Sequence, residues 1–189
     1  MATTNNRAKS NRQTSAKPAQ ENAAAQDDVL AVEDAPKNMI PKEIDPHQYI
    51  TVRNGFQGKL VYKSPHTGER FVWDSFGAEQ DIELAELKRA KSSSKKFFIN
   101  NWFMFDEQWV VDYLGMNQYY KYALGIDSFD SLFELPADEV EAAVGKLSGG
   151  QKKSVAYRAR QLIADGSIDS NKTIAVLEKT LGVDLVDRG

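Results

Sequence analysis

The sequence predicts an α+β protein in which a small antiparallel β-hairpin or sheet follows a disordered N-terminal arm and precedes a compact C-terminal helical bundle. All 19 aromatic residues (3 Trp, 7 Tyr and 9 Phe) lie between Tyr49 and Tyr157, so the core is expected there. Apolar and polar residues alternate within 58–74, as they do in half-buried strands. From Asp106 onward, residues that start and stop helices follow one another at short intervals.

The arm is predicted at residues 1–43, because this part of the chain has no aromatic residue and is rich in Ala, Asn, Gln, Lys and Ser. Such a segment cannot bury enough apolar surface to offset the entropy of ordering. Among residues 1–36 the bases come first and the acids follow, as Arg7, Lys9, Arg12 and Lys17 and then Glu21, Asp27, Asp28, Glu33 and Asp34. Two interpretations stay open: a solvated tail, or an arm that orders along a neighbouring subunit.

Residues 44–189 are predicted to form a single domain, β-rich over 44–105 and helical over 106–189. The β-rich part contains two segments, 58–63 and 70–74, whose apolar positions alternate as Leu60, Tyr62, Phe71 and Trp73. The link between them includes a proline and a glycine, which suits a hairpin turn. An isolated hairpin is marginally stable, so its aromatic face has to pack against another segment.

That segment is expected to be 97–105, FFINNWFMF, the most apolar run of the chain. Its pattern allows either a third strand or a short buried helix. We expect it to join the hairpin and the helices in one core, with Trp102 at its centre. The helical side would contribute Trp109, Tyr113, Leu162 and Leu177.

The helical part is predicted from capping residues and apolar stripes. Short links between the helices favour a compact bundle. The expected helices are one capped by Asp106 and closed by Gly115, one from Asn117 to Gly125, one with Pro136 in its first turn, one over 149–165, and one capped by Ser170 and ended by Gly182.

The pentapeptide Leu-Ser-Gly-Gly-Gln at 147–151 matches the signature motif of ATP-binding-cassette ATPases, including the basic helix that follows it. Such an ATPase also needs a phosphate-binding loop, Gly-x4-Gly-Lys-Ser/Thr. The two Gly-Lys pairs, Gly58-Lys59 and Gly145-Lys146, are each followed by Leu, so this loop is missing. We therefore expect no enzymatic activity and no cofactor.

The same residues are predicted to start a helix. Ser148 and Gln151 have the spacing of a capping box, in which the Ser148 hydroxyl accepts from the Gln151 N–H and the Gln151 side chain reaches back to the Ser148 N–H. Gly149 and Gly150 would let the chain turn into the helix without steric cost. The alternative is an anion or nucleic-acid contact at this helix N-terminus, through Lys152, Lys153, Arg158 and Arg160.

Composition argues against several other classes of function. The formal net charge is −3, so no global basic field draws the chain to nucleic acid. The chain has no cysteine, and its two histidines, His47 and His66, have no partner at metal-binding spacing, so no metal site is expected. No run of 18 apolar residues exists, so no membrane contact is expected.

Two polar clusters are assigned to structure rather than to chemistry. The acidic cluster is interpreted as a solvated edge followed by the first turn of a helix; it consists of Glu79, Asp81, Glu83 and Glu86. The aromatic cluster could stack on bases, but core packing is the favoured interpretation; it consists of Tyr119, Tyr120, Lys121 and Tyr122.

Residues 49–105, followed by 147–185, resemble a group of small proteins encoded by tailed bacteriophages and prophages of Gram-positive hosts. The resemblance lies in the overall pattern and leaves out the N-terminal arm. It implies a non-enzymatic structural or assembly role in the virion, with other virion proteins or copies of itself as partners. The protein would then be located in the virion and assembled in the host cytoplasm. The alternative function is a small intracellular regulator that binds nucleic acid through its C-terminal helices.

Overall fold

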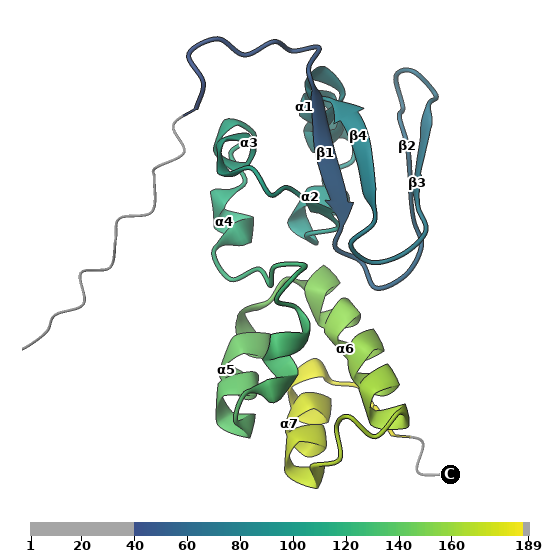
Figure 1. Ribbon diagram of the computed structural model, residues 1–189, viewed down its shortest axis with the longest axis vertical. Coiled ribbons are helices and arrows are strands. Elements are labelled where there is room, and N and C mark those ends of the chain that lie inside the picture. The colour runs from purple at the N-terminus through teal and green to yellow at the C-terminus, as the bar shows by residue number, and fades with distance from the viewer. Residues whose placement is uncertain (1–39, 187–189) are drawn as a thin grey trace, which may run out of the picture. The chain divides into compact units, whose positions relative to one another are not determined.

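The computed structural model describes residues 40–186 (Figure 1). The α+β class is confirmed: a small antiparallel sheet and a hairpin precede the C-terminal helices. The predicted arm at 1–43 lies outside the described residues, except for residues 40–43, whose side chains are exposed. Ile44, the first residue of the predicted domain, packs against the core.

The three-stranded sheet is antiparallel and has the order β4-β1-β5. Its strands are β1 (Tyr49–Asn54), β4 (Glu79–Glu83) and β5 (Phe103–Met104). Ile50 stands opposite Ile82 in the register of β1 with β4, and both side chains are buried. This alternation places the apolar residues of β1 on the face that the helices cover.

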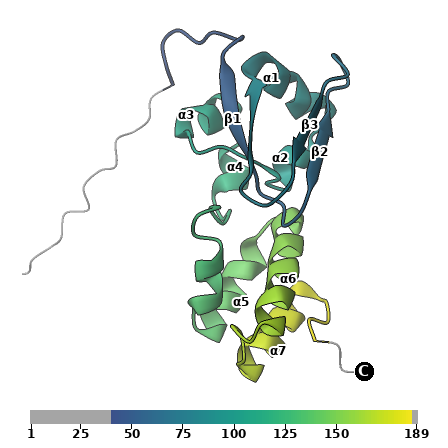
Figure 2. The same cartoon turned by 45° about the vertical axis from the view of Figure 1, so that its right-hand side comes forward.

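The predicted hairpin is confirmed as β2 (Leu60–Lys63) and β3 (Arg70–Trp73), which run side by side in Figure 2. Leu60 stands opposite Trp73, and Tyr62 stands opposite Phe71, with all four side chains buried. The turn contains Gly68 at φ +74°, in the left-handed region that glycine adopts without strain.

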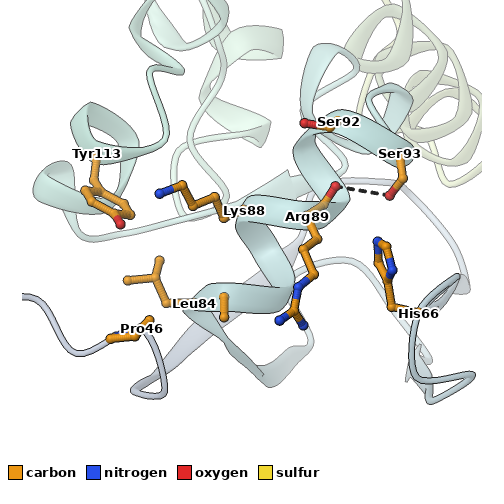
Figure 3. A pocket seen from close by; sticks show the side chains of 9 residues that line it. Pro46, His66, Leu84, Lys88, Arg89, Ser92, Ser93 and Tyr113 are labelled. Carbon is orange, nitrogen blue, oxygen red and sulfur yellow. Dashed lines mark hydrogen bonds between the residues drawn. The ribbon is translucent and has the colours of Figure 1, made fainter.

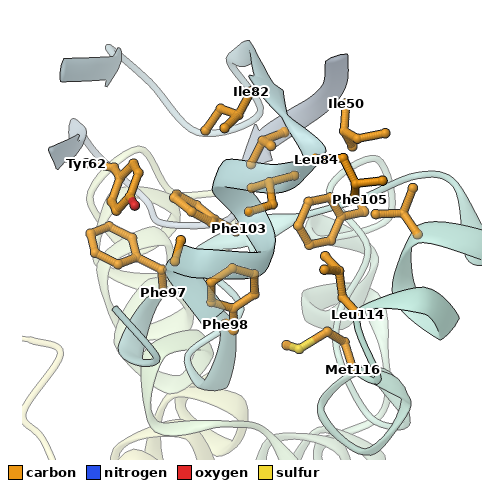
Figure 4. Close-up of a cluster of buried hydrophobic side chains, with 14 of the residues drawn as sticks. Ile50, Tyr62, Ile82, Leu84, Phe97, Phe98, Phe103, Phe105, Leu114 and Met116 are labelled. Carbon is orange, nitrogen blue, oxygen red and sulfur yellow. The ribbon is translucent and has the colours of Figure 1, made fainter. Parts of the chain in front are cut away.

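Segment 97–105 contains both of the structures that its sequence allowed. Helix α2 (Lys96–Ile99) comes first, and β5 follows after a sharp turn at Asn101, which is buried and has φ +55°. Helix α1 (Leu84–Ser93) lies beside it and buries Leu84 and Leu87. Together these elements cover the aromatic face of the hairpin (Figure 4). We call this cluster the first core; its largest buried members are Tyr62, Trp73, Ile82, Leu84, Leu87, Phe98, Phe103 and Met116.

Two short helices follow, and here two predicted details are wrong. Helix α3 (Gln108–Tyr113) has Glu107 at its N-cap position and no side-chain capping bond, because Asp106 turns instead toward the guanidinium of Arg53. Helix α4 (Asn117–Tyr120) is one turn long and ends well before Gly125.

The last part of the chain is helical, as predicted. It contains a 3₁₀ turn at Asp130–Glu134 and three helices, α5 (Ala137–Lys146), α6 (Gly149–Ala164) and α7 (Asn171–Leu181). Ser170 caps α7 by accepting from the Thr173 N–H, and Gly182 ends it at φ +68°. Helices α5 and α6 both contact α7. Buried residues of these helices, of the 3₁₀ turn and of the adjoining loops form the second core, whose members are Phe129, Leu132, Val140, Val144, Leu147, Val155, Ala156, Ala159, Leu177 and Leu185.

The expectation of one core joined through 97–105 is therefore wrong. Segment 97–105 belongs to the first core, whereas Leu177 belongs to the second and Leu162 is only half-buried. The reason is that α1 and α2 already cover the hairpin, so the C-terminal helices are free to pack on one another. Phe76, from the loop between β3 and β4, packs on the second core with its ring centroid 4.9 Å from that of Phe129.

Candidate functional site

The N-terminus of α6 carries the LSGGQ motif, and its cap is confirmed. Ser148 is the N-cap residue, and its Oγ accepts from the Gln151 N–H at 3.2 Å. The predicted return bond from the Gln151 side chain to the Ser148 N–H is wrong. That side chain is 1% exposed and binds Leu124, where its Oε1 accepts from the N–H at 3.0 Å and its Nε2 donates to the carbonyl at 2.9 Å.

Two more residues of α6 contact segments of the β-rich part. Gly150 lies so close to Asn100 that a Cβ on the glycine would be 2.3 Å from the carbonyl oxygen of Asn100. Ser154 is fully buried, and its Oγ accepts from the Gln57 N–H at 3.3 Å and donates to the Gly55 carbonyl at 3.2 Å. We call the contacts that Gly150, Gln151 and Ser154 make with Asn100, Leu124, Gly55 and Gln57 the seam. The seam fastens α6 to the β-rich part and to the loop after α4.

Ser148→Ala is expected to lower the free energy of unfolding by about 0.5–2 kcal/mol, because it removes the acceptor that caps α6. Chemical denaturation followed by circular dichroism measures this loss. Ser148→Asp restores an acceptor at the cap and is the matched control, so its stability should stay near that of the wild-type protein. Equal losses in both variants would contradict the capping role.

The four bases predicted as an anion or nucleic-acid contact do not form one free cationic surface. Arg158 forms an ion pair with Asp130 at 2.6 Å, and Arg160 donates to the Asp184 carbonyl at 2.8 Å. Lys153 is exposed and Lys152 is half-buried, and within residues 40–186 neither forms an ion pair.

Arg53 of β1 binds three carboxylates, and no motif in the sequence connects them with it. Its side chain is 15% exposed and lies 2.9 Å from Asp127, 3.4 Å from Asp106 and 3.6 Å from Glu79. The hydrogen bonds to Asp127 raise the pKa of Arg53 further above its usual range and lower the pKa of Asp127 below its ordinary value of 3.8. Asp106 and Asp127 follow Arg53 by more than fifty residues, so only the fold brings these groups together.

The low pKa of Asp127 predicts a pH dependence of known sign. Because this pKa is lower in the folded than in the unfolded protein, the pair stabilises the fold above about pH 4 and loses its effect as the pH falls through the folded pKa. Arg53→Gln should raise the pKa of Asp127 toward 3.8, measured from the carboxyl carbon shift by NMR.

Asp165 provides the matched control for that titration. Its pKa is lowered chiefly by hydrogen bonds from Ser167, so Arg53→Gln should leave the Asp165 titration in place. An Asp127 titration that does not move in the variant would show that Arg53 has no part in lowering its pKa.

The acidic cluster is more ordered than the sequence predicted. Asp81 accepts from the Thr51 hydroxyl, and Glu83 contacts the imidazole of His47. Glu86 lies in the first turn of α1, as predicted. It is not solvated there, because it is 4% exposed and accepts from the Tyr62 hydroxyl at 2.6 Å. Burial, with a further contribution from the Glu86 bond, raises the pKa of Tyr62.

Across residues 40–186, no three side chains of His, Cys, Asp or Glu come together as metal ligands would. The Tyr62–Glu86 hydrogen bond lies at the first core, where it connects α1 to the hairpin.

The aromatic cluster after α3 is divided between core and surface. Tyr119 and Tyr120 pack against the first core, and the Tyr120 hydroxyl accepts from the Phe105 N–H at 2.9 Å. Tyr122 is 48% exposed, with the Nζ atoms of Lys121 and Lys146 at 5.2 and 5.6 Å from its ring centroid. The three tyrosines do not form a shared stacking surface.

A groove of about 710 Å³ lies along the exposed side of α1. Its floor is apolar, and no acidic side chain of the described residues lines it. In Figure 3, His66 of the hairpin turn faces α1 from one side and Tyr113 of α3 faces it from the other. We call it the α1 groove; its main lining residues are Pro46, His66, Leu84, Lys88, Arg89 and Tyr113.

The cations of the α1 groove are held loosely. The Lys88 Nζ lies 5.6 Å from the ring centroid of Tyr113, and an Arg89 nitrogen lies 3.9 Å from Glu86. Both side chains are exposed. The groove thus combines an apolar floor with positive charge that an anionic partner can reach. This surface could not be predicted from the sequence, because its residues come from four separate segments: the chain before β1, the hairpin turn, α1 and α3.

Comparisons with known protein families, with characterised proteins and with solved structures find no match to this chain. Within residues 40–186, no helix has the length and apolar character that crossing a membrane requires.

Proposed function

We propose that this chain is a non-enzymatic structural or assembly protein of a tailed-phage virion, and that it acts by binding other proteins. The observation that carries the proposal is the use of the LSGGQ motif inside the molecule. The side-chain amide of Gln151 forms hydrogen bonds with both the N–H and the carbonyl of Leu124, and Gly150 lies against Asn100. The residues that most resemble an enzyme motif therefore act as a structural joint.

Two further points support a binding role. The overall sequence pattern resembles that of small virion and assembly proteins of phages and prophages. The α1 groove offers an apolar floor with reachable charge, which is the composition of many protein-binding surfaces. The alternative, a nucleic-acid-binding regulator, has less support because Arg158 and Arg160 are already engaged within the chain.

Mass spectrometry of purified phage particles tests the proposal. The chain should be present in particles at a fixed ratio to the major capsid or tail protein, and it should survive a high-salt wash. A host protein of similar abundance is the control for material trapped during purification. Absence from particles, together with salt-sensitive binding to DNA, would reject the virion role and favour the regulator.

A further inference from the structure

We propose that the α1 groove binds the acidic segment 21–36 of a second copy of the chain. This inference rests on the proposed function, because it names the contact through which copies of an assembly protein would join. In the groove itself, Lys88 and Arg89 stand over a floor that includes Leu84 and Pro46. A partner that fits this surface needs negative charge and apolar side chains close together.

Segment 21–36 has this chemistry. It contains five acids and no base, and the apolar run Val29-Leu30-Ala31-Val32 stands between the pairs Asp27-Asp28 and Glu33-Asp34. An extended peptide of this kind can place apolar side chains on the floor while its carboxylates reach the cations.

The length of chain before the groove allows the contact between copies. Nine residues lie between Pro36, the end of the segment, and Pro46 at the groove, and an extended chain covers about 3.3–3.6 Å for each of the ten steps between them. The segment can thus reach about 35 Å from its own domain. Because the two surfaces differ, each copy would use its segment on one neighbour and its groove on another. Such head-to-tail contacts build rings or filaments, which are the assemblies of a virion.

A nucleic acid is the less suitable occupant. Phosphate backbones are bound by rows of cations that release many counterions. Among residues 40–186, the α1 groove offers two cations, Lys88 and Arg89, across a floor that is largely apolar. An acidic peptide uses both parts of this surface, whereas a phosphate backbone uses only the charge.

Disulfide trapping between two full-length variants tests the contact, since the chain has no cysteine of its own. One copy carries Ala31→Cys in the acidic segment, and a mass-tagged copy carries Ser92→Cys at the edge of the groove. When the two variants are mixed under mild oxidation, they should form the disulfide-linked heterodimer about tenfold faster than a control pair. A tenfold difference corresponds to about 1.4 kcal/mol. The control pair replaces Ser92→Cys with Ser167→Cys, which is exposed in the loop between α6 and α7.

Charge changes then identify the groove as the binding surface. Lys88→Glu in the groove copy should reduce trapping severalfold. Changing the acids of segment 21–36 to lysine in the other copy should restore trapping to the Lys88→Glu variant, because the charges are then reversed on both sides. Trapping should also fall in 1 M salt, where the screening length is about 3 Å. Arg89→Gln provides a second, milder change if Lys88→Glu alters the fold.

Three results would overturn the inference. The first is trapping no faster than with Ser167→Cys. The second is an intramolecular disulfide in an Ala31→Cys, Ser92→Cys double variant that forms at a rate independent of dilution, which would place the segment on the groove of its own copy. The third is DNA binding that Lys88→Glu abolishes. If the chain is present in particles while trapping fails, only the groove inference fails; trapping without presence in particles rejects only the virion role.

Discussion

Gly150→Ala is expected to destabilise the protein by about 3 kcal/mol, the upper end of the usual range for an overpacked interior. The new Cβ would lie 2.3 Å from both the Cβ and the carbonyl oxygen of Asn100, and 2.8 Å from its Cα. Backbone atoms cannot move aside as the end of a side chain can, so the seam has to shift. The higher helix propensity of alanine offsets about 1 kcal/mol at most. Denaturant unfolding followed by circular dichroism measures the result.

Gly149→Ala is the matched control for this prediction. A Cβ at position 149 has its nearest neighbour, the Asn100 Oδ1 atom, at 4.0 Å, which is ordinary contact. This variant should be as stable as the wild-type protein or slightly more so. If both variants lost the same stability, flexibility at the start of α6 rather than the approach to Asn100 would explain the two glycines.

Trp73→Ala is expected to cost about 3–5 kcal/mol, the usual loss when a large aromatic side chain is removed from a packed site. Trp73 is fully buried, packs against Phe103, and donates from its indole nitrogen to the Val52 carbonyl at 2.8 Å. Its removal leaves a cavity in the first core and takes away the hydrogen bond from the indole nitrogen to β1. The loss should be visible as a lower midpoint of urea unfolding.

Trp102→Ala serves as the comparison, because Trp102 is only partly buried and its indole nitrogen finds no hydrogen-bond partner among residues 40–186. Its loss should be clearly smaller than that of Trp73→Ala. The two variants also test the predicted single domain at 44–189. If Trp73→Ala lowered the midpoint for the sheet while α5–α7 melted as before, the seam would be too weak to couple the two cores.

The sequence predicted the elements whose signals are local. Alternation at Leu60, Tyr62, Phe71 and Trp73 located the hairpin, and the Ser170 cap with Gly182 located α7. Segment 97–105 was ambiguous, because the turn that divides it into α2 and β5 is at Asn101, and asparagine adopts the left-handed region only occasionally.

The parts that could not be predicted depend on partners distant in sequence. Gln151 has the spacing of a capping box, in which its side chain would form one hydrogen bond. The backbone of Leu124, 27 residues away in sequence, forms two hydrogen bonds with that side chain instead. Arg53 and its carboxylates, and Glu86 with Tyr62, are likewise assembled by the fold. Local patterns identify which residues start a helix, but they do not reveal what a polar side chain meets in the interior.

The seam has a thermal consequence. Apolar surface raises the heat capacity when it becomes exposed, whereas polar surface lowers it. Melting of either core would therefore carry a large heat-capacity change. Parting of the seam, which exposes amide and hydroxyl groups and few rings besides Phe76, would carry a small one. Such an opening would leave little trace in a calorimeter, and would be detected instead by faster hydrogen exchange at the Leu124 and Gln57 amides, whose acceptors belong to α6.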